Sequence, residues 1–198
     1  MARRSSLSTL LLASLFLATG CSSFGGSDDN SADNDGGGEG SQTDLTGVED
    51  ELLLLINDER VTAGLPVLIR DPGIDTVMGF HGEYMADQQD LTHIDVAGRD
   101  SEARARYYGD APAVRCLEII QWWGGTPSGM VHYEGYFNSE DHHAAYMEEG
   151  IFNLGPTSHA GVTAVAGLGP AGTQYENRDG SWTGVMLCDR EFEIVINP

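Results

Sequence analysis

Three short segments of the chain carry residues whose chemistry suits cation binding or proton transfer. They contain His93, Glu118 and His142. Histidine changes its charge near neutral pH, and its neutral ring is a common metal ligand. Glu118 lies in the apolar run Leu117-Glu118-Ile119-Ile120, where a buried carboxylate needs a partner. Because the three segments lie far apart in the sequence, only the fold can bring them together.

The N-terminus has the features of a secretory signal. Two arginines, Arg3 and Arg4, precede an apolar run over 7–18 that is too short to span a membrane. The small residues before Cys21 resemble a lipobox, in which this cysteine is lipidated and becomes the mature N-terminus. We therefore expect a lipoprotein signal peptide over 1–20 and attachment to the extracellular face of the membrane through Cys21. The alternative is an ordinary cleaved signal and a secreted protein, by either Sec or Tat export.

A polar segment separates this signal from the folded part of the chain. Residues 21–46 are mainly Gly, Ser, Asp and Asn, with almost nothing apolar. Such a composition cannot bury enough surface to offset the entropy of ordering. We expect an acidic, disordered tether that holds one domain, residues 47–198, away from the membrane.

The charge balance excludes one class of partner. The chain has 31 acidic and 10 basic residues, a net charge of −21, and every basic residue is arginine. This balance argues against nucleic acid, which binds through a positive face. Many carboxylates without lysine suit a protein that stays soluble in high salt, so we expect a halophilic source. High genomic GC content is the alternative cause.

Hydrophobic spacing predicts helices first and strands last. Helices are expected from Val48 to the turn at Gly64, over 74–88 and over 139–148, with a helical turn around Arg104. Strands are expected over 160–169, 181–188 and 192–196. This order indicates an α+β domain in which helices cover an antiparallel sheet.

The order of the segments resembles the CAP superfamily, also called the SCP-like extracellular domain (cysteine-rich secretory proteins, antigen 5 and pathogenesis-related proteins group 1). The likeness is greatest to its prokaryotic branch. Residues 51–60 are similar to the opening helix of that branch, and eight segments follow the family order. The family's "fSH", "GENIA" and "nSPGHR" elements correspond in turn to Leu91-Thr92-His93, Cys116-Leu117-Glu118-Ile119-Ile120 and Asn138-Ser139-Glu140-Asp141-His142.

This resemblance implies a three-layer α-β-α sandwich with a central antiparallel sheet and an open cleft where the two histidines and the glutamate converge. In some family members the cleft binds a divalent cation, zinc rather than calcium or magnesium. Carried over by position, the metal ligands are His93 and His142, and Glu118 is a third ligand or the catalytic base that acts on a bound water. The alternative is structural: both histidines bond to Glu118 or its neighbours and lock helices to the sheet.

Other polar and aromatic residues are given structural roles or left open. If Cys21 carries lipid, Cys116 and Cys188 remain as a pair that forms either a disulfide or two separate buried thiols. Trp122 and Trp123 either belong to the core or line a groove for an apolar or sugar ligand. The remaining residues have these expected roles: His81 is a core residue, His143 points away from the cleft because helical neighbours lie about 100° apart, His132 and His159 have no supporting pattern, and Asn57, Glu59 and Arg60 anchor the first helix.

Two functional interpretations follow from the resemblance. The first is a surface-anchored binding module whose cleft takes a cation and whose ligand is a small molecule, a lipid-like molecule or a protein. The second is a metal-dependent, peptidase-like hydrolase that uses His93, Glu118 and His142. Because the fold is shared by family members with no agreed enzymatic activity, we favour the binding module.

Overall fold

The computed structural model describes residues 44–109, 111–149, 154–155 and 158–195. The predicted signal peptide, Cys21 and most of the predicted tether lie outside these ranges. Within them, no helix combines the length and the apolar character needed to cross a lipid bilayer. The helices are α1 (Thr46–Thr62), α2 (Pro72–Gln88), α3 (Ser101–Tyr108), α4 (Gly129–Phe137) and α5 (Glu140–Tyr146), and the strands are β1 (Ile69–Arg70), β2 (Cys116–Gly124), β3 (His159–Leu168) and β4 (Asp179–Cys188).

The strands form one sheet in the order β1-β3-β4-β2. Strands β3 and β2 both pair with β4 in the antiparallel sense, as predicted, whereas the two-residue β1 runs parallel to β3. The sheet is therefore mixed at one edge. Strand β2 forms the other edge, so it has a neighbouring strand on one side only.

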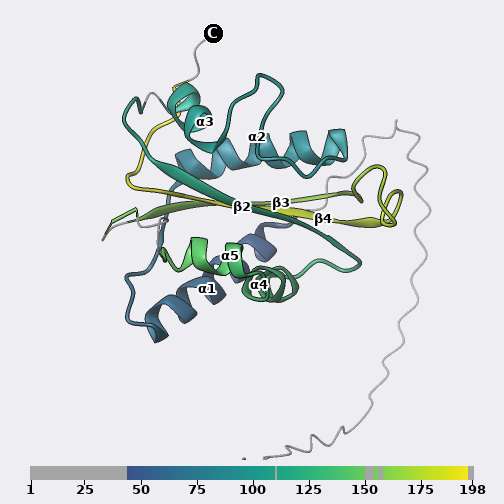
Figure 1. Ribbon diagram of the computed structural model, residues 1–198, viewed down its shortest axis with the longest axis horizontal. Helices are drawn as coiled ribbons and strands as arrows, with labels where there is room; N and C mark the ends of the chain where they lie inside the picture. The colour runs from purple at the N-terminus through teal and green to yellow at the C-terminus, as the bar shows by residue number, and fades with distance from the viewer. Residues whose placement is uncertain (1–43, 110, 150–153, 156–157, 196–198) are drawn as a thin grey trace, which may run out of the picture. The chain divides into compact units, whose positions relative to one another are not determined.

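Helices cover both faces of the sheet, which confirms the predicted three-layer sandwich (Figure 1). Helices α2 and α3 lie on one face, and α1, α4 and α5 lie on the other. Apolar clusters fill the spaces between the layers, and two of them are the largest. The cluster under α1, α4 and α5 includes Leu52, Ile56, Ile119, Tyr146 and Val185. The cluster under α2 and α3 includes Ile74, Val77, Met78 and Met186.

The start of α2 follows from its capping residues. Asp71 lies at the N-cap, where its carboxylate accepts a hydrogen bond from the Ile74 backbone N–H at 2.9 Å. Pro72 occupies the first helical turn, where its missing N–H costs no hydrogen bond. The helix therefore begins two residues before the expected residue 74.

Strand β2, like β4, packs against helices on both of its faces, although it carries polar residues within its apolar run. Along this strand Cys116, Glu118 and Ile120 point toward α2 and α3, while Ile119 and Gln121 point toward the opposite layer. An apolar residue on each face removes the alternation that marks a strand with one solvated side. The strand places Glu118 between its two apolar neighbours with its carboxylate facing α2 and α3.

Helix α4 is a second element that sequence patterning missed. Its first residue, Gly129, approaches α1 so closely that an added Cβ would lie 2.5 Å from the Leu52 backbone nitrogen. The Gly129 N–H donates to the Glu51 carboxylate at 2.6 Å. Locally, the Ser128 hydroxyl caps the helix by accepting from the Val131 N–H at 3.2 Å, so the start combines a local cap with a tertiary contact.

The prediction of a strand over 192–196 is wrong across its described part, 192–195. The Val195 N–H donates to the Tyr108 carbonyl of α3 at 2.8 Å instead of to a strand. Phe192 is buried beside Gly109, where an added Cβ would lie 2.1 Å from the phenyl ring. Apolar contacts with α2 and α3 therefore hold this segment against the outside of the helical layer.

Candidate functional site

The contact between His93 and Glu118 lies at the edge of the sheet. His93 comes from the segment after α2, and its Nδ1 lies 2.9 Å from Oε2 of Glu118 on β2. The His93 side chain is 53% exposed, whereas that of Glu118 is 1% exposed. Because an ionised carboxylate only accepts hydrogen bonds, Nδ1 carries the proton and donates it to Glu118. In the neutral ring, the other nitrogen, Nε2, then carries the lone pair.

Arg104 supplies the partner that a buried Glu118 requires. Its guanidinium, also 1% exposed, donates from Nη2 to Oε1 of Glu118. From Nη1 it donates to the His93 carbonyl at 2.8 Å and to the Arg99 carbonyl at 3.2 Å. One arginine thus neutralises the carboxylate and fixes the backbone of the histidine that the carboxylate orients. The predicted helical turn around Arg104 is the helix α3.

His81 is buried on α2, as predicted for a core residue, and it also holds the His93 segment. Its Nε2 donates to the Thr92 carbonyl at 2.7 Å and lies 3.7 Å from Oε2 of Glu118. Burial lowers the pKa of His81, which keeps the ring neutral, and the charge of Glu118 opposes this effect only in part. The residue before His93 is therefore tied to the helical layer.

His142 approaches the same edge from α5, on the other face of the sheet. Its half-buried ring packs edge-on against Tyr136, with 5.3 Å between ring centroids. Burial lowers the pKa of His142, and the nearby His93 imidazole lowers it further. The two rings therefore interact electrostatically. The adjacent His143 turns away to Glu59, with Nε2 2.8 Å from Oε1, as the helical spacing predicts.

The arrangement of donors bears on the expected metal. Both Glu118 oxygens already accept hydrogen bonds, one from Arg104 and one from His93. Among the residues that the structure describes, no group of three or more His, Cys, Asp or Glu side chains is placed to hold a metal ion. This geometry lets Glu118 orient His93 from behind, as carboxylates do for metal-binding histidines. Zinc binding stays a prediction, with His93, His142 and Glu118 as the expected ligands.

A disulfide clamps the start of β2. Cys116 and Cys188 face each other on β2 and β4, with their Cα atoms 4.2 Å apart, and their sulfur atoms are bonded. Of the two alternatives left open by the sequence, the structure has the disulfide. The bond lies two residues from Glu118, so it fixes the edge strand where the site is built.

The structure also contains a buried polar network that the sequence did not reveal. His132 on α4 donates from Nε2 to the Ser181 hydroxyl at 2.8 Å, and its Nδ1 lies 2.9 Å from the Thr183 hydroxyl. Gln121 donates to the same Nδ1 at 2.9 Å. Burial lowers the pKa of His132 to about 4. Both His132 and Ser181 are 0% exposed, so this pair is part of the scaffold and is closed to substrates.

The polar residues of α1 have the anchoring role predicted for them. Asn57 exchanges two hydrogen bonds with the Leu68 backbone, at 2.7 and 3.1 Å. Arg60 donates to the Pro66 and Tyr146 carbonyls and pairs with Glu148 at 3.3 Å. Glu59 accepts from the hydroxyl of Tyr146 at 2.5 Å. These contacts hold α1 against α5 and the following turn.

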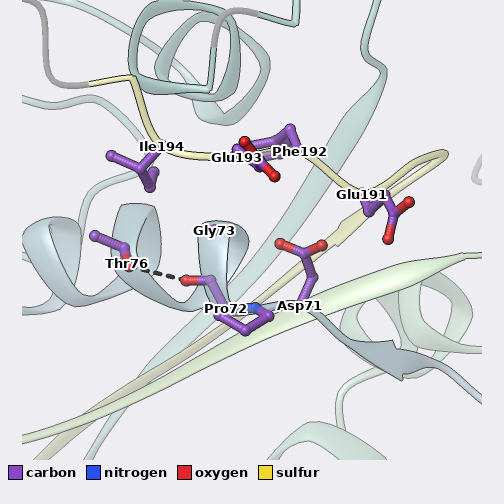
Figure 2. A pocket seen from close by; sticks show the side chains of 8 residues that line it. All are labelled: Asp71, Pro72, Gly73, Thr76, Glu191, Phe192, Glu193 and Ile194. Carbon is purple, nitrogen blue, oxygen red and sulfur yellow. Dashed lines mark hydrogen bonds between the residues drawn. The ribbon is translucent and has the colours of Figure 1, made fainter.

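Two of the hollows away from His93 lie at the start of α2 and at the end of β2. The larger, about 730 Å³, opens where α2 begins, and Figure 2 shows the Asp71, Glu191 and Glu193 carboxylates around it. Among the residues drawn there, the Thr76 hydroxyl donates a hydrogen bond to the Pro72 carbonyl within α2. The other, about 500 Å³, lies at the end of β2 beside Trp122.

Comparison with known proteins places the fold. No protein-family model matches this sequence, and neither does any curated protein sequence. The solved structure of an outer surface protein from Borrelia burgdorferi aligns with a TM-score of 0.56 and 17% identity, covering 77% of this chain and 99% of that protein.

Two further solved structures align at lower scores. An extracellular protein containing a SCP domain from Bacillus anthracis aligns with a TM-score of 0.47 and 17% identity, over 72% of this chain and 40% of that one. A cysteine-rich secretory protein from Staphylococcus aureus aligns with a TM-score of 0.44 and 11% identity, over 77% of this chain and 41% of that one. At these identities the likeness is one of fold. The described part of this chain therefore shares the fold of the Borrelia burgdorferi protein, and its three layers are those that the sequence predicts.

Proposed function

We propose that this chain is a surface-tethered binding module and that its ligand-binding cleft is built around His93, beside the edge strand β2. The observation that carries this proposal is the half-exposed imidazole held from behind by a buried ion pair. Desolvating Arg104 and Glu118 is unfavourable unless their contacts compensate for it. Here those contacts fix a ring that faces solvent, which is the arrangement of a preorganised binding residue.

A divalent cation is the ligand that suits the exposed donors. His93, through Nε2, and His142 would each offer an imidazole nitrogen to a cation. Imidazole nitrogen suits zinc better than calcium or magnesium, since those two ions prefer oxygen ligands. Two protein ligands would leave coordination positions open for a further ligand. That ligand would be a small molecule, a lipid-like molecule or a protein.

A metal-dependent, peptidase-like hydrolase is the second candidate function. It needs Glu118 as a base toward a bound water. In the described structure the Glu118 side chain is 1% exposed and accepts a hydrogen bond on each oxygen, so a bound water would reach it only if a neighbouring side chain moved. The geometry therefore supports binding better than hydrolysis.

A zinc titration of the full chain by calorimetry tests the cation site. We expect His93→Ala and His142→Ala each to weaken zinc binding at least tenfold, because each removes one of two donors. His143→Ala is the matched control, since this ring contacts Glu59 on α1. Undetectable zinc binding by the unaltered chain, or equal affinity in all four proteins, would exclude the site.

A peptidase screen separates the two functions. Metal-dependent turnover that disappears in a folded Glu118→Gln variant would establish the hydrolase and remove the binding module from consideration. We expect no such turnover. The circular dichroism spectrum of the variant provides the check that the loss of the carboxylate has not simply unfolded the domain.

A further inference from the structure

A groove of about 500 Å³ lies at the far end of β2 from the disulfide. Its volume falls within the range typical of small-molecule sites. Trp122 follows Glu118 by four positions on β2, a distance of about 13 Å along an extended strand. The groove is therefore separate from the His93 cleft. Its lining consists of Trp122, Trp123, Gly124, Gly125, Tyr175, Arg178 and Asp179.

An aromatic pair forms one wall of the groove. The rings of Trp122 and Tyr175 lie 5.5 Å apart between centroids, at an interplanar angle of 39°. Tyr175 belongs to the turn between β3 and β4 and is 42% exposed. Trp123, the next residue of β2, is also 42% exposed and lines the same groove. The groove thus offers aromatic surface to a ligand.

Glycines hold the Trp122 indole in place. A Cβ added at Gly124 or Gly180 would lie 2.8 or 2.6 Å from the indole ring, and one at Gly169 would lie 3.0 Å from it. A real Cβ at these distances would be in very tight contact with the ring, so glycine lets the backbone lie directly against it. Because three backbone segments pack directly against the indole, the ring is fixed before any ligand arrives, which reduces the entropy lost on binding.

Charged groups of opposite sign stand beside the aromatic wall. The Arg178 guanidinium lies 5.9 Å from the Tyr175 ring centroid, and Asp179 follows it directly in the chain. Both side chains are exposed. The buried Trp122 Nε1 has no hydrogen-bond partner among the described residues. Hydrogen-bond donors and an acceptor therefore lie beside the aromatic wall of the groove. The charges of Arg178 and Asp179 cancel, so together they add no net charge.

We propose that this groove binds a neutral saccharide. A sugar ring presents an apolar C–H face that packs on an aromatic ring, and its hydroxyls both donate to a carboxylate and accept from a guanidinium. Asp179 disfavours an anionic ligand, and Arg178 disfavours a cationic one. A hydrocarbon chain would leave both charged groups without partners. A neutral polyhydroxylated ring is the ligand class that uses every group in the lining.

Titration of the full chain with a panel of neutral hexasaccharides tests the proposal. The probes are cellohexaose, maltohexaose, mannohexaose and N-acetylated chitohexaose, followed by calorimetry and tryptophan fluorescence. We expect at least one to bind, and Tyr175→Ala and Arg178→Ala each to weaken that binding about tenfold. Tyr107→Ala is the matched control, because this tyrosine is 51% exposed on α3 and does not line the groove.

Several outcomes would overturn the proposal. These are no binding by any neutral probe, equal binding in the Tyr175 and Arg178 variants, or binding only of an anionic hexauronate or of tetramethylammonium. Arg178→Ala keeps the test valid if Tyr175→Ala fails to fold, since Arg178 is exposed. Saccharide binding that persists in His93→Ala and in EDTA would separate this groove from the zinc cleft, so either site can fail without the other.

Discussion

The Arg104 guanidinium and the Glu118 carboxylate form a buried ion pair directly behind the exposed ring of His93, with each side chain only 1% exposed. The pair joins α3 to the edge strand β2, and the remaining arginine hydrogen bonds hold the His93 backbone. Stability and site geometry are therefore coupled through the same two residues. A change at Glu118 acts on both.

Replacing Glu118 with Gln should destabilise the domain by about 3–5 kcal/mol, the usual effect of leaving one buried charge without its counter-ion. Amide and carboxylate have nearly the same shape, so the loss reports on charge and hydrogen bonding and not on packing. Urea unfolding followed by circular dichroism measures it.

A surface ion pair provides the control for this substitution. Glu102 pairs with Arg106 one helical turn away on α3, and their side chains are 36% and 42% exposed. Glu102→Gln should change the unfolding free energy by less than about 1 kcal/mol, because solvent screens exposed pairs. Equal effects of the two substitutions would contradict the assignment of Arg104 and Glu118 as a buried charge pair.

The buried His132 should make the domain less stable in mild acid. Its pKa is lowered by burial from 6.5 to about 4, so below pH 6.5 the unfolded chain takes up a proton that the folded chain does not. The contribution of His132 to the free energy of unfolding is greatest above pH 6.5. It falls as the pH drops toward 4 and then levels off. The total change is about 3 kcal/mol, at 1.36 kcal/mol for each pH unit.

Comparison with His132→Asn isolates this contribution. The variant lacks the titrating group, while His81 and His142, whose pKa values are also lowered, remain in both proteins. The difference in unfolding free energy between the two proteins should therefore shrink by about 3 kcal/mol between pH 7 and pH 4. A difference that stays constant with pH would show that His132 does not titrate as its burial requires.

The elements that sequence reasoning located are those with strong local signals. Helix α2 has an apolar stripe, a capping aspartate and a proline in its first turn, so its position was predicted to within two residues. Strands β3 and β4 were also found. Strand β2 and helix α4 were missed: β2 carries Glu118 and Gln121 within its apolar run, and α4 has only a capping serine and a glycine that meets α1 at its start.

The site was predictable in its parts but not in its connections. The sequence indicated that a carboxylate at 118 needs a partner and that residue 104 lies in a helical turn. It did not indicate that Arg104 is that partner, since the ion pair joins a helix to a strand that patterning had not found. Arg104 bonds one Glu118 oxygen and His93 the other, which supports a role for Glu118 in holding His93.

Lipid attachment at Cys21 is a prediction that concerns residues outside the described ranges. If the cysteine is lipidated, cells that express the full chain should retain it in the membrane fraction, and Cys21→Ser should release it into the soluble fraction. Phase partitioning in a mild detergent measures the difference. Equal retention of the two proteins would contradict lipidation, and release of both would support the secreted alternative.

Removing the disulfide should lower stability without removing the fold. Cys116 and Cys188 are separated by 72 positions in the sequence, so their bond closes a long loop in the unfolded chain. For a loop of this length, the chain-entropy model gives a stabilisation of about 4 kcal/mol. The double variant Cys116→Ala/Cys188→Ala should show this loss in urea unfolding, whereas Cys21→Ser should not. The unaltered protein in excess reductant should fall to the level of the double variant.

A double variant as stable as the unaltered protein would mean that strand pairing between β2 and β4 alone holds the edge of the sheet on which Glu118 lies.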